Sequence, residues 1–272
     1  MSAEAPVPAG RYTDDYYAGR CGGAEFFERY GAEVLKPQLA YSLSRAGLAA
    51  GMRVLDVGCG RGELLLHVRR AGARGIGTDY APAALRLARK VSGCPVLCCD
   101  AKALPFAGAA FDRIFLLGVV DHLHDWELER CFAELSRVLK PGGKVVIHTC
   151  VNRWYYKRWT YRLRLRLARL ARACGLGLRD PSPPKSDEDE ALHVNEHSLG
   201  DLRRFFARIR WTAAVEPRPN YKVELRRLYE PLPPDFPLRP AGLWKAFWHR
   251  LLWRPPASWL LARELFCVAE PG

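Results

Sequence analysis

The sequence lacks any apolar run that approaches the roughly 20 residues a helix needs to cross a bilayer. Its opening segment, MSAEAPVPAG, has neither the basic start nor the apolar centre of a signal peptide. It also has no C-x-x-C pair, and its 9 cysteines are an odd, scattered set. We therefore expect the cysteines to be reduced, buried small hydrophobic residues in a cytoplasmic protein that is soluble or peripheral to the inner face of the membrane.

Charge, in contrast, is abundant and uneven. The chain carries 42 Lys and Arg against 29 Asp and Glu, a formal net charge of +13. This balance favours anionic partners such as nucleic acid, an anionic membrane surface or an acidic substrate. Because 49% of the residues are apolar, the chain can also form a sizeable folded core.

The most informative stretch is Met52–Glu63, MRVLDVGCGRGE. Strand-forming residues 53–57 run directly into Gly58, Gly60 and Gly62, and an amphipathic stretch follows at once. This order predicts a buried strand, a glycine turn and a helix N-terminus, the arrangement with which α/β folds hold nucleotide-like ligands.

Strands and helices alternate along most of the remaining sequence. Strands are predicted at 74–79, 95–99, 111–118, 144–149, 211–216 and 265–269, and helices at 81–91, 126–139 and 198–209. Pro141-Gly142-Gly143 is expected to stop the second of these helices, and Ser198 to cap the third. The alternation predicts a Rossmann-like, doubly wound, mostly parallel sheet.

Two segments depart from this pattern. Residues 1–48 form a helical preface, broken at Pro37, whose aromatic residues at helical spacing are expected in the core; they are Phe26, Phe27 and Tyr30. Residues 152–190 are an insertion between the two parts of the main domain, 49–151 and 191–272.

The glycine loop distinguishes two kinds of nucleotide ligand. A dinucleotide fingerprint requires a third glycine where this chain has Glu63. Asp56, which precedes the loop on the strand, would repel a pyrophosphate and suits a ligand with an ammonium group.

The motif D-V-G-C-G-R-G resembles the first motif of class I S-adenosylmethionine-dependent methyltransferases, in particular the small-molecule subgroup. Asp79, Asp100 in CCDAKALPF, and the segments FDRIFLLGVVDHLHD, RCFAELSRVLKPGGKVVI and HVNEHSLGDLRRFF are similar to later motifs of that family. The resemblance implies a seven-stranded sheet whose last strand is antiparallel, and S-adenosylmethionine as cofactor.

The same resemblance implies a set of donor-binding residues. Asp79 would accept hydrogen bonds from the ribose hydroxyls, Asp100 would meet the adenine amino group, and Ala101 would offer a backbone amide. Tyr12, Tyr16 and Tyr17 resemble aromatic residues that fold over the donor, and Arg20 would meet its carboxylate. The remaining implied contacts are Asp56, Gly58, Cys59, Gly60, Gly62, Tyr80 and Leu117.

The loop after the fourth strand, Gly118-Val119-Val120-Asp121-His122, departs from some branches of the family. It contains no D/N-P-P-Y signature, which argues against exocyclic amino methylation of adenine or of glutamine, and no Pro-Cys pair, which argues against methylation of cytosine C5.

Methyl transfer needs a general base only when the acceptor is a hydroxyl or a weak carbon acid. His122 and His124 are the candidates, and a structural hydrogen bond is the alternative role for His122. His148 is expected in the core. His193 and His197 could bind a metal as a helical pair, but no third ligand is apparent and we expect no metal.

Residues 153–172 of the insertion contain basic residues and no acid. An apolar stripe at helical spacing favours a helix over a strand; it comprises Tyr156, Trp159, Leu163, Leu167, Leu170 and Cys174. The helix could cap the active site with its apolar face inward, contact an anionic membrane as well, or contact RNA. The tryptophan-rich stretch 243–259 could supply a second interfacial contact.

These patterns predict a methyltransferase that acts on a small, apolar or lipid-linked acceptor at oxygen, carbon or nitrogen. The alternatives are an RNA methyltransferase and a non-catalytic S-adenosylmethionine-binding protein. Nucleic acid is not the expected partner, because the chain has no recognisable RNA-binding appendage. The sequence leaves the oligomeric state open.

Overall fold

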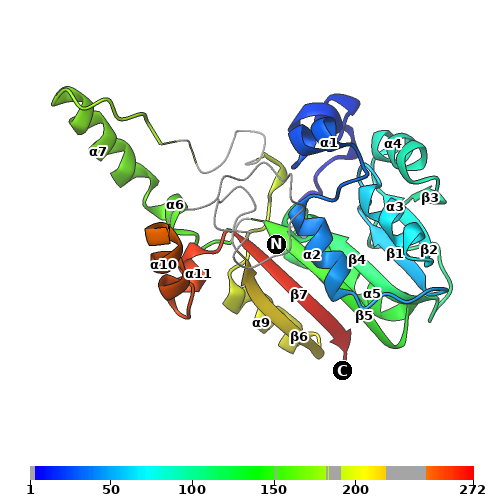
Figure 1. The fold of residues 1–272 in the computed structure, drawn as a ribbon. Coiled ribbons are helices and arrows are strands. Elements are labelled where there is room, and N and C mark those ends of the chain that lie inside the picture. The colour runs from blue at the N-terminus through cyan, green and yellow to red at the C-terminus, as the bar shows by residue number, and fades with distance from the viewer. Residues whose placement is uncertain (1–3, 151, 182, 184–190, 219–242) are drawn as a thin grey trace.

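A seven-stranded sheet forms the centre of the computed structural model, which describes residues 4–150, 152–181, 183, 191–218 and 243–272 (Figure 1). The strand order is β3-β2-β1-β4-β5-β7-β6. The strands are β1 Arg53–Val57, β2 Arg74–Asp79, β3 Val96–Cys98, β4 Phe111–Leu117, β5 Leu139–Cys150, β6 Trp211–Arg218 and β7 Glu264–Pro271. β1 to β5 pair in parallel, and β7 runs antiparallel to both β5 and β6. The expected sheet and its antiparallel last strand are confirmed.

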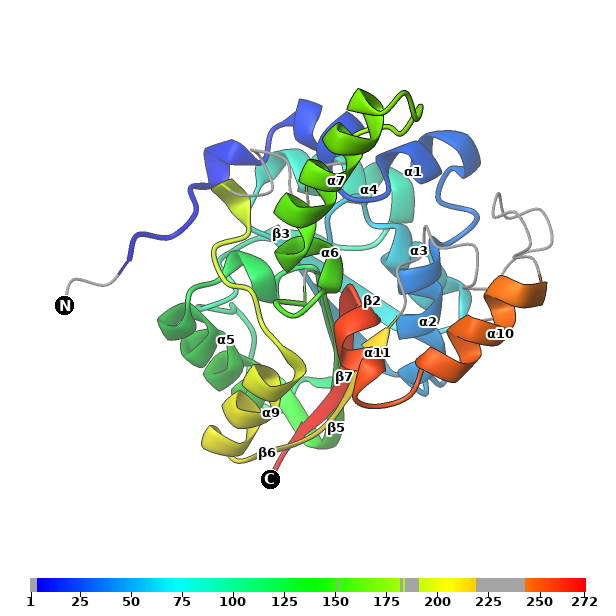
Figure 2. The same ribbon diagram turned by 90° about the vertical axis from the view of Figure 1, so that its left-hand side faces the viewer.

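Helices cover both faces of the sheet (Figure 2). On one face, α5 (Asp125–Val138) and α9 (Leu199–Arg208) bury Phe132 and Phe206 in the largest apolar cluster. On the other face lie α2 (Pro37–Arg45), α3 (Glu63–Arg70) and α4 (Pro82–Ser92). Because parallel strands share one direction, the carboxyl ends of β1, β2 and β4 meet at the same edge of the sheet, where open α/β sheets bind ligands.

The predicted start of α9 and the predicted end of α5 can be compared with the structure. Ser198 caps α9 as expected: its Oγ accepts from the backbone N–H of Asp201 at 3.1 Å, and its own N–H donates to Asp201 Oδ2 at 2.8 Å. α5 ends within one residue of the predicted helix end, but Pro-Gly-Gly is not the element that stops it, and the next strand begins earlier than the predicted residue 144. α5 ends at Val138 and β5 begins at Leu139, so residues 140–143 form an irregularity within the strand, between the Phe111–Leu139 and Arg113–Lys144 pairs.

The preface and the insertion are helical. Short turns η1 (Ala9–Arg11) and η2 (Tyr16–Arg20) precede α1 (Ala24–Tyr30), and Pro37 begins α2 after the predicted break. The insertion folds as α6 (Tyr156–Trp159) and α7 (Tyr161–Ala173), which confirms helix over strand. Beyond it, α10 (Leu243–Leu252) and α11 (Ala257–Leu261) precede β7. Residues 219–242 of the predicted irregular stretch lie outside the described residues.

All nine cysteines are unpaired, but their burial differs from the expectation. Cys59, Cys94, Cys131 and Cys267 are buried, whereas Cys98 and Cys174 are exposed. Among the described residues, no helix is both long enough and apolar enough to cross a membrane.

Gly62 shows how the glycine loop is packed. Its φ is +80°, and a Cβ at this position would lie 2.7 Å from the Cα of Ala88 on α4. We expect Gly62→Ala to lower the free energy of unfolding by about 2–4 kcal/mol, because backbone strain adds to overpacking. Urea denaturation measures this. Gly10→Ala, where a Cβ meets nothing within 4 Å, is the control, and equal stability of the two variants would contradict the packing described.

Candidate functional site

The glycine loop and the ends of the first two strands form the floor of a cavity. The Gly58 and Cys59 N–H groups donate to the Thr78 carbonyl at 2.8 and 2.9 Å, and the Gly60 N–H donates to Asp79 Oδ2 at 3.0 Å. Gly60 has a φ of +51°, and a Cβ there would meet only the Tyr17 ring, at 3.9 Å. The loop therefore presents bare backbone to the cavity, which is what a ligand that approaches closely requires.

Asp79 is the buried acid at the end of β2. Its Oδ1 accepts from the Ala81 N–H at 2.9 Å, and burial raises the pKa of its carboxyl group. At the end of β3, Lys102 Nζ lies 2.9 Å from Asp100 Oδ2 and 2.7 Å from Glu127 Oε1. Both acids line the cavity, as the sequence predicted, but Asp100 is already paired with a cation.

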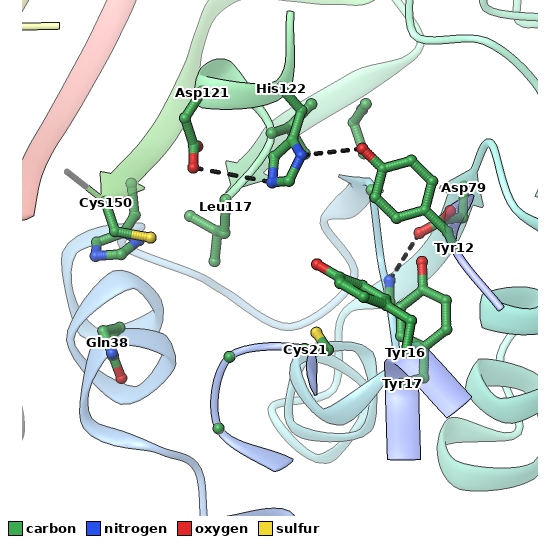
Figure 3. Close-up of a pocket in the computed structure, with 18 of the residues that line it drawn as sticks. Tyr12, Tyr16, Tyr17, Cys21, Gln38, Asp79, Leu117, Asp121, His122 and Cys150 are labelled. Atoms are coloured by element: carbon green, nitrogen blue, oxygen red, sulfur yellow. Dashed lines mark hydrogen bonds and ion pairs between the residues drawn. The ribbon is translucent and has the colours of Figure 1, made fainter. Parts of the chain in front are cut away.

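The cavity has a volume of about 690 Å³ and collects most of the predicted site residues (Figure 3). Those that line it are Tyr12, Tyr16, Tyr17, Arg20, Gly58, Gly60, Asp79, Tyr80, Asp100, Ala101, Leu117 and His122. Four others do not line it: Asp56, Cys59, Gly62 and His124. The donor contacts predicted for the first three stay predictions. Asp56 is buried on β1, Cys59 is buried within the loop, and Gly62 packs against Ala88 of α4.

His124 does not share the position of His122. It precedes α5 as its N-cap residue, its Nδ1 lies 2.8 Å from Glu4 Oε2, and its Nε2 lies 3.1 Å from the Ala5 carbonyl. These partners belong to the N-terminal segment rather than to the cavity, so His124 is not in place to act as a base.

His122 lies in a chain of polar groups on the cavity wall (Figure 3). Its Nδ1 is 2.9 Å from the Tyr12 hydroxyl, and its Nε2 is 3.8 Å from Oδ2 of the fully buried Asp121. Asp121 Oδ2 also lies 3.3 Å from His193 Nε2, and Oδ1 accepts from the Thr149 hydroxyl at 3.2 Å. Burial, with the Asp121 charge second, raises the pKa of Tyr12, so this phenol stays neutral.

The sequence assigned no role to Asp121, and it suggested a role for His193 only as a metal ligand paired with His197. The expected pairing of His193 with His197 on a helix is not observed, because residues 193–198 precede α9 without being helical. Instead, ligand atoms of Asp121, His122 and His193 lie within 4.8 Å of one another, a spacing that could hold a metal ion. The absence of a metal stays a prediction.

Arg61, a residue of the glycine loop to which the sequence assigned no role, attaches the preface to the loop. Arg61 is buried, its guanidinium donates to the carbonyls of Tyr17 and Gly22 at 3.4 and 3.2 Å, and it pairs with Glu63 at 3.1 Å. This cation holds the tyrosine-bearing segment over the loop. Phe26, expected in the core, lines the cavity as well.

A second polar group lies on the cavity wall away from the glycine loop. His148 Nε2 is 3.2 Å from Glu264 Oε2, and Gln38 Nε2 donates to Glu264 Oε1 at 3.4 Å. All three side chains are buried. His148 is thus buried as expected, yet it faces the cavity rather than an apolar core.

Asp56 makes a testable contribution to stability. Burial, reinforced by Asp79 and Glu63, raises its pKa from 3.8 to about 8. The folded protein then binds more protons than the unfolded chain between these pH values, so stability falls as pH rises through this window. We expect Asp56→Asn to make the free energy of unfolding less dependent on pH. The variant should be more stable than wild type at pH 8 by at least about 1 kcal/mol. Urea titrations across pH measure this, with the exposed Asp15→Asn as control; parallel slopes would contradict it.

Comparisons with known proteins agree with this geometry. Residues 55–147 match the family model described as a methyltransferase domain. The ubiquinone/menaquinone biosynthesis C-methyltransferase of Bordetella parapertussis is 38% identical over 117 residues, which cover 40% of this chain and 44% of that protein. The probable tRNA methyltransferase 9B of Mus musculus is 37% identical over 99 residues, 36% of this chain and 22% of that protein. The chain thus spans less than half the length of these curated relatives.

A similar solved structure is that of Haemonchus contortus phosphoethanolamine N-methyltransferase 2 in complex with phosphomonomethylethanolamine and S-adenosylhomocysteine. Its TM-score is 0.59 at 17% identity, and the match covers 96% of this chain and 58% of that chain. At this identity the likeness concerns the fold. The sheet, the bare glycine loop and the acid at the end of β2 define the class I S-adenosylmethionine-dependent methyltransferases. The matched part of the chain, residues 55–147, is a methyltransferase domain of that class, whose cofactor is S-adenosylmethionine.

Proposed function

We propose that this protein transfers a methyl group from S-adenosylmethionine to a small, apolar or lipid-linked acceptor that must lose a proton. The observation that carries the proposal is the position of His122. It lies on the wall of the same cavity as Gly60 and Asp79, with Tyr12 on one ring nitrogen and Asp121 behind the other.

The donor supplies an electrophilic methyl group on a sulfonium. The protein's residues then have two tasks, to hold the reactants together away from water and to move a proton. Gly58, Gly60 and Asp79 would hold the donor. Leu117 and Phe26 line the cavity and give it apolar surface for an acceptor.

The proton transfer follows from the Tyr12–His122 contact. The Tyr12 phenol is neutral and can donate to an unprotonated His122 Nδ1. An acceptor hydroxyl against the Tyr12 oxygen would pass its proton to that oxygen as the phenolic proton moves to His122. Asp121 would stabilise the resulting imidazolium, whose charge appears only as the acceptor becomes nucleophilic.

An acceptor of the quinol type is consistent with the name of the Bordetella relative, a ubiquinone/menaquinone biosynthesis C-methyltransferase, and with a phenolic proton to remove. The experiment offers methyl-labelled donor with a reduced demethylated quinone in detergent, and separately with bulk tRNA. The proposal expects label in the quinone or in another organic-soluble acceptor. Label in tRNA alone would favour the RNA alternative, and label in no fraction would favour a donor-binding protein without catalysis.

A further inference from the structure

Large apolar side chains are exposed along the insertion. Trp159, Leu163, Leu167 and Leu170 on α6 and α7 retain 55–64% of their accessible surface. The described residues of the insertion line no part of the cavity, so the apolar stripe does not cap it with its apolar face inward. In Figure 1, α7 projects from one end of the molecule.

A second exposed apolar group lies on α10 and α11, about 80 residues further along the chain. Trp244 is 72% exposed, Phe247 56% and Trp248 42%, and their rings contact one another with centroids 5.6–6.1 Å apart. On α11, Trp259 and Leu260 are exposed by 40% and 39%. Exposed apolar residues on this scale mark an interaction site rather than ordinary surface.

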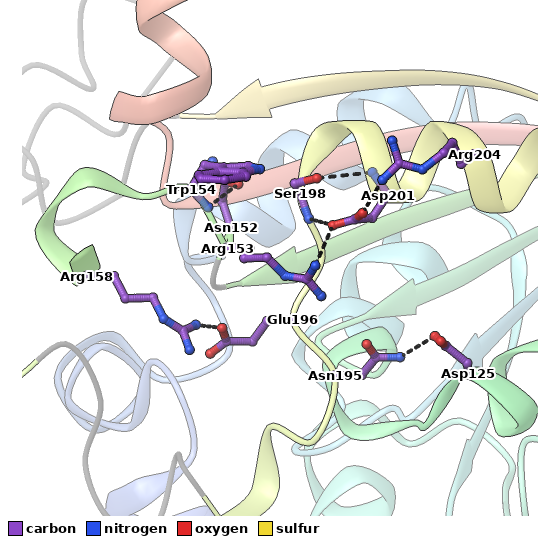
Figure 4. Close-up of polar contacts among 10 residues, drawn as sticks. All are labelled: Asp125, Asn152, Arg153, Trp154, Arg158, Asn195, Glu196, Ser198, Asp201 and Arg204. Carbon is purple, nitrogen blue, oxygen red and sulfur yellow. Dashed lines mark hydrogen bonds and ion pairs between the residues drawn. The ribbon is translucent and has the colours of Figure 1, made fainter.

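The two groups lie at the same end of the molecule. α6 lies near α11 in Figures 1 and 2, and α10 leads into α11 at this end. Asn152 Nδ2 donates to the carbonyls of Trp259 and Ala262 at 2.6 and 2.9 Å. Arg153 and Arg158 fix the start of the insertion through ion pairs to Asp201 and Glu196 (Figure 4). This is also the end at which β5 finishes, and Cys150, its last residue, lines the cavity.

The charge of the insertion selects among possible partners. α6 and α7 carry basic residues and no acid; the basic residues are Lys157, Arg158, Arg162, Arg164, Arg166, Arg169 and Arg172. Arginines beside a stripe of leucine and tryptophan are typical of helices that lie in the surface of an anionic bilayer. A protein partner would not require the excess of positive charge, and a second copy would repel it.

We propose that α6–α7 and α10–α11 form one membrane-binding surface for anionic lipid bilayers. Since no described helix is long and apolar enough to cross a membrane, the helices would lie in the interface. For a lipid-linked acceptor, this contact would bring the cavity to the bilayer that holds it. That consequence rests on the proposed function, whereas the membrane contact itself does not.

The test is flotation of the full-length protein with vesicles of phosphatidylcholine alone and with 30% phosphatidylglycerol. We expect at least tenfold stronger binding to the anionic vesicles, weakened by salt. Arg162→Glu/Arg166→Glu/Arg169→Glu should weaken anionic binding by roughly a hundredfold, and Trp244→Ala/Trp248→Ala should weaken binding to both vesicle types.

The control is Arg89→Glu/Lys90→Glu/Arg130→Glu, the same charge change at exposed positions on α4 and α5. Circular dichroism checks that each variant is folded. Equal loss in the control and the α7 variant, or no preference for anionic vesicles, would overturn the proposal. So would a dimer by light scattering that is lost in the Trp244/Trp248 variant, or binding of bulk tRNA with none to vesicles. None of these readouts requires methyl transfer, so the proposed function can fail separately.

Discussion

An Asp79→Asn variant is expected to bind S-adenosylmethionine about 100-fold more weakly than the wild-type protein. The carboxylate lies at the carboxyl end of β2, lines the cavity and holds the Gly60 N–H at 3.0 Å. Asparagine keeps nearly the same shape and one acceptor oxygen but loses the charge, and charge-assisted hydrogen bonds are worth about 1.5–3 kcal/mol each. Equilibrium dialysis with labelled donor measures the change.

Asp112→Asn is the matched control, because Asp112 lies near the amino end of β4, at the edge of the sheet opposite the glycine loop, and is paired with Lys140. It should leave donor affinity unchanged. Urea denaturation separates a binding defect from unfolding. Wild-type affinity in a folded Asp79→Asn protein would mean that the donor does not bind over this strand end.

His122→Gln should lower the turnover rate by about 10²–10⁴-fold while leaving donor affinity unchanged, since general bases contribute on that scale. The glutamine can still meet the Tyr12 hydroxyl but cannot take up a proton. General-base catalysis makes the wild-type rate depend on pH, and this dependence should weaken in the variant. Steady-state kinetics with labelled donor across pH measure both effects.

His124→Gln provides a close control, because His124 is two residues away yet faces Glu4 and Ala5 outside the cavity. It should retain the wild-type rate and pH profile. A His122→Gln enzyme with an unaltered profile would leave His122 a structural residue and would place the acceptor elsewhere.

The sequence predicted β1, β2 and β4 well because they are short, mostly buried runs that end in an acid or lead directly into a glycine. Gly60 and Asp79 lie close in sequence and belong to consecutive parallel strands, so their meeting at one edge follows from topology. The start of β5 was harder to predict, because Pro-Gly-Gly marks a break in either a helix or a strand, and only the pairing of Leu139 with Phe111 places these residues in the strand.

The rest of the site depends on contacts that no local pattern encodes. Asp121 and His193 are far apart in the chain and meet through a non-helical segment before α9. His148 and Glu264 meet across the antiparallel β5–β7 pair, so their contact depends on strand register. The stripe of α7 is ambiguous for a different reason: helical spacing is the same whether leucines cover a cavity or face a membrane, and only exposure distinguishes them.

The most direct test of the methyltransferase assignment is a single-turnover reaction of the wild-type protein with methyl-labelled S-adenosylmethionine and an organic extract of the cells that make it. The account predicts that label moves into an organic-soluble product in wild type and in His124→Gln, and that this transfer is lost in Asp79→Asn and strongly slowed in His122→Gln. Transfer that persists unchanged in the Asp79 and His122 variants, or no labelled product with any extract fraction, would contradict it.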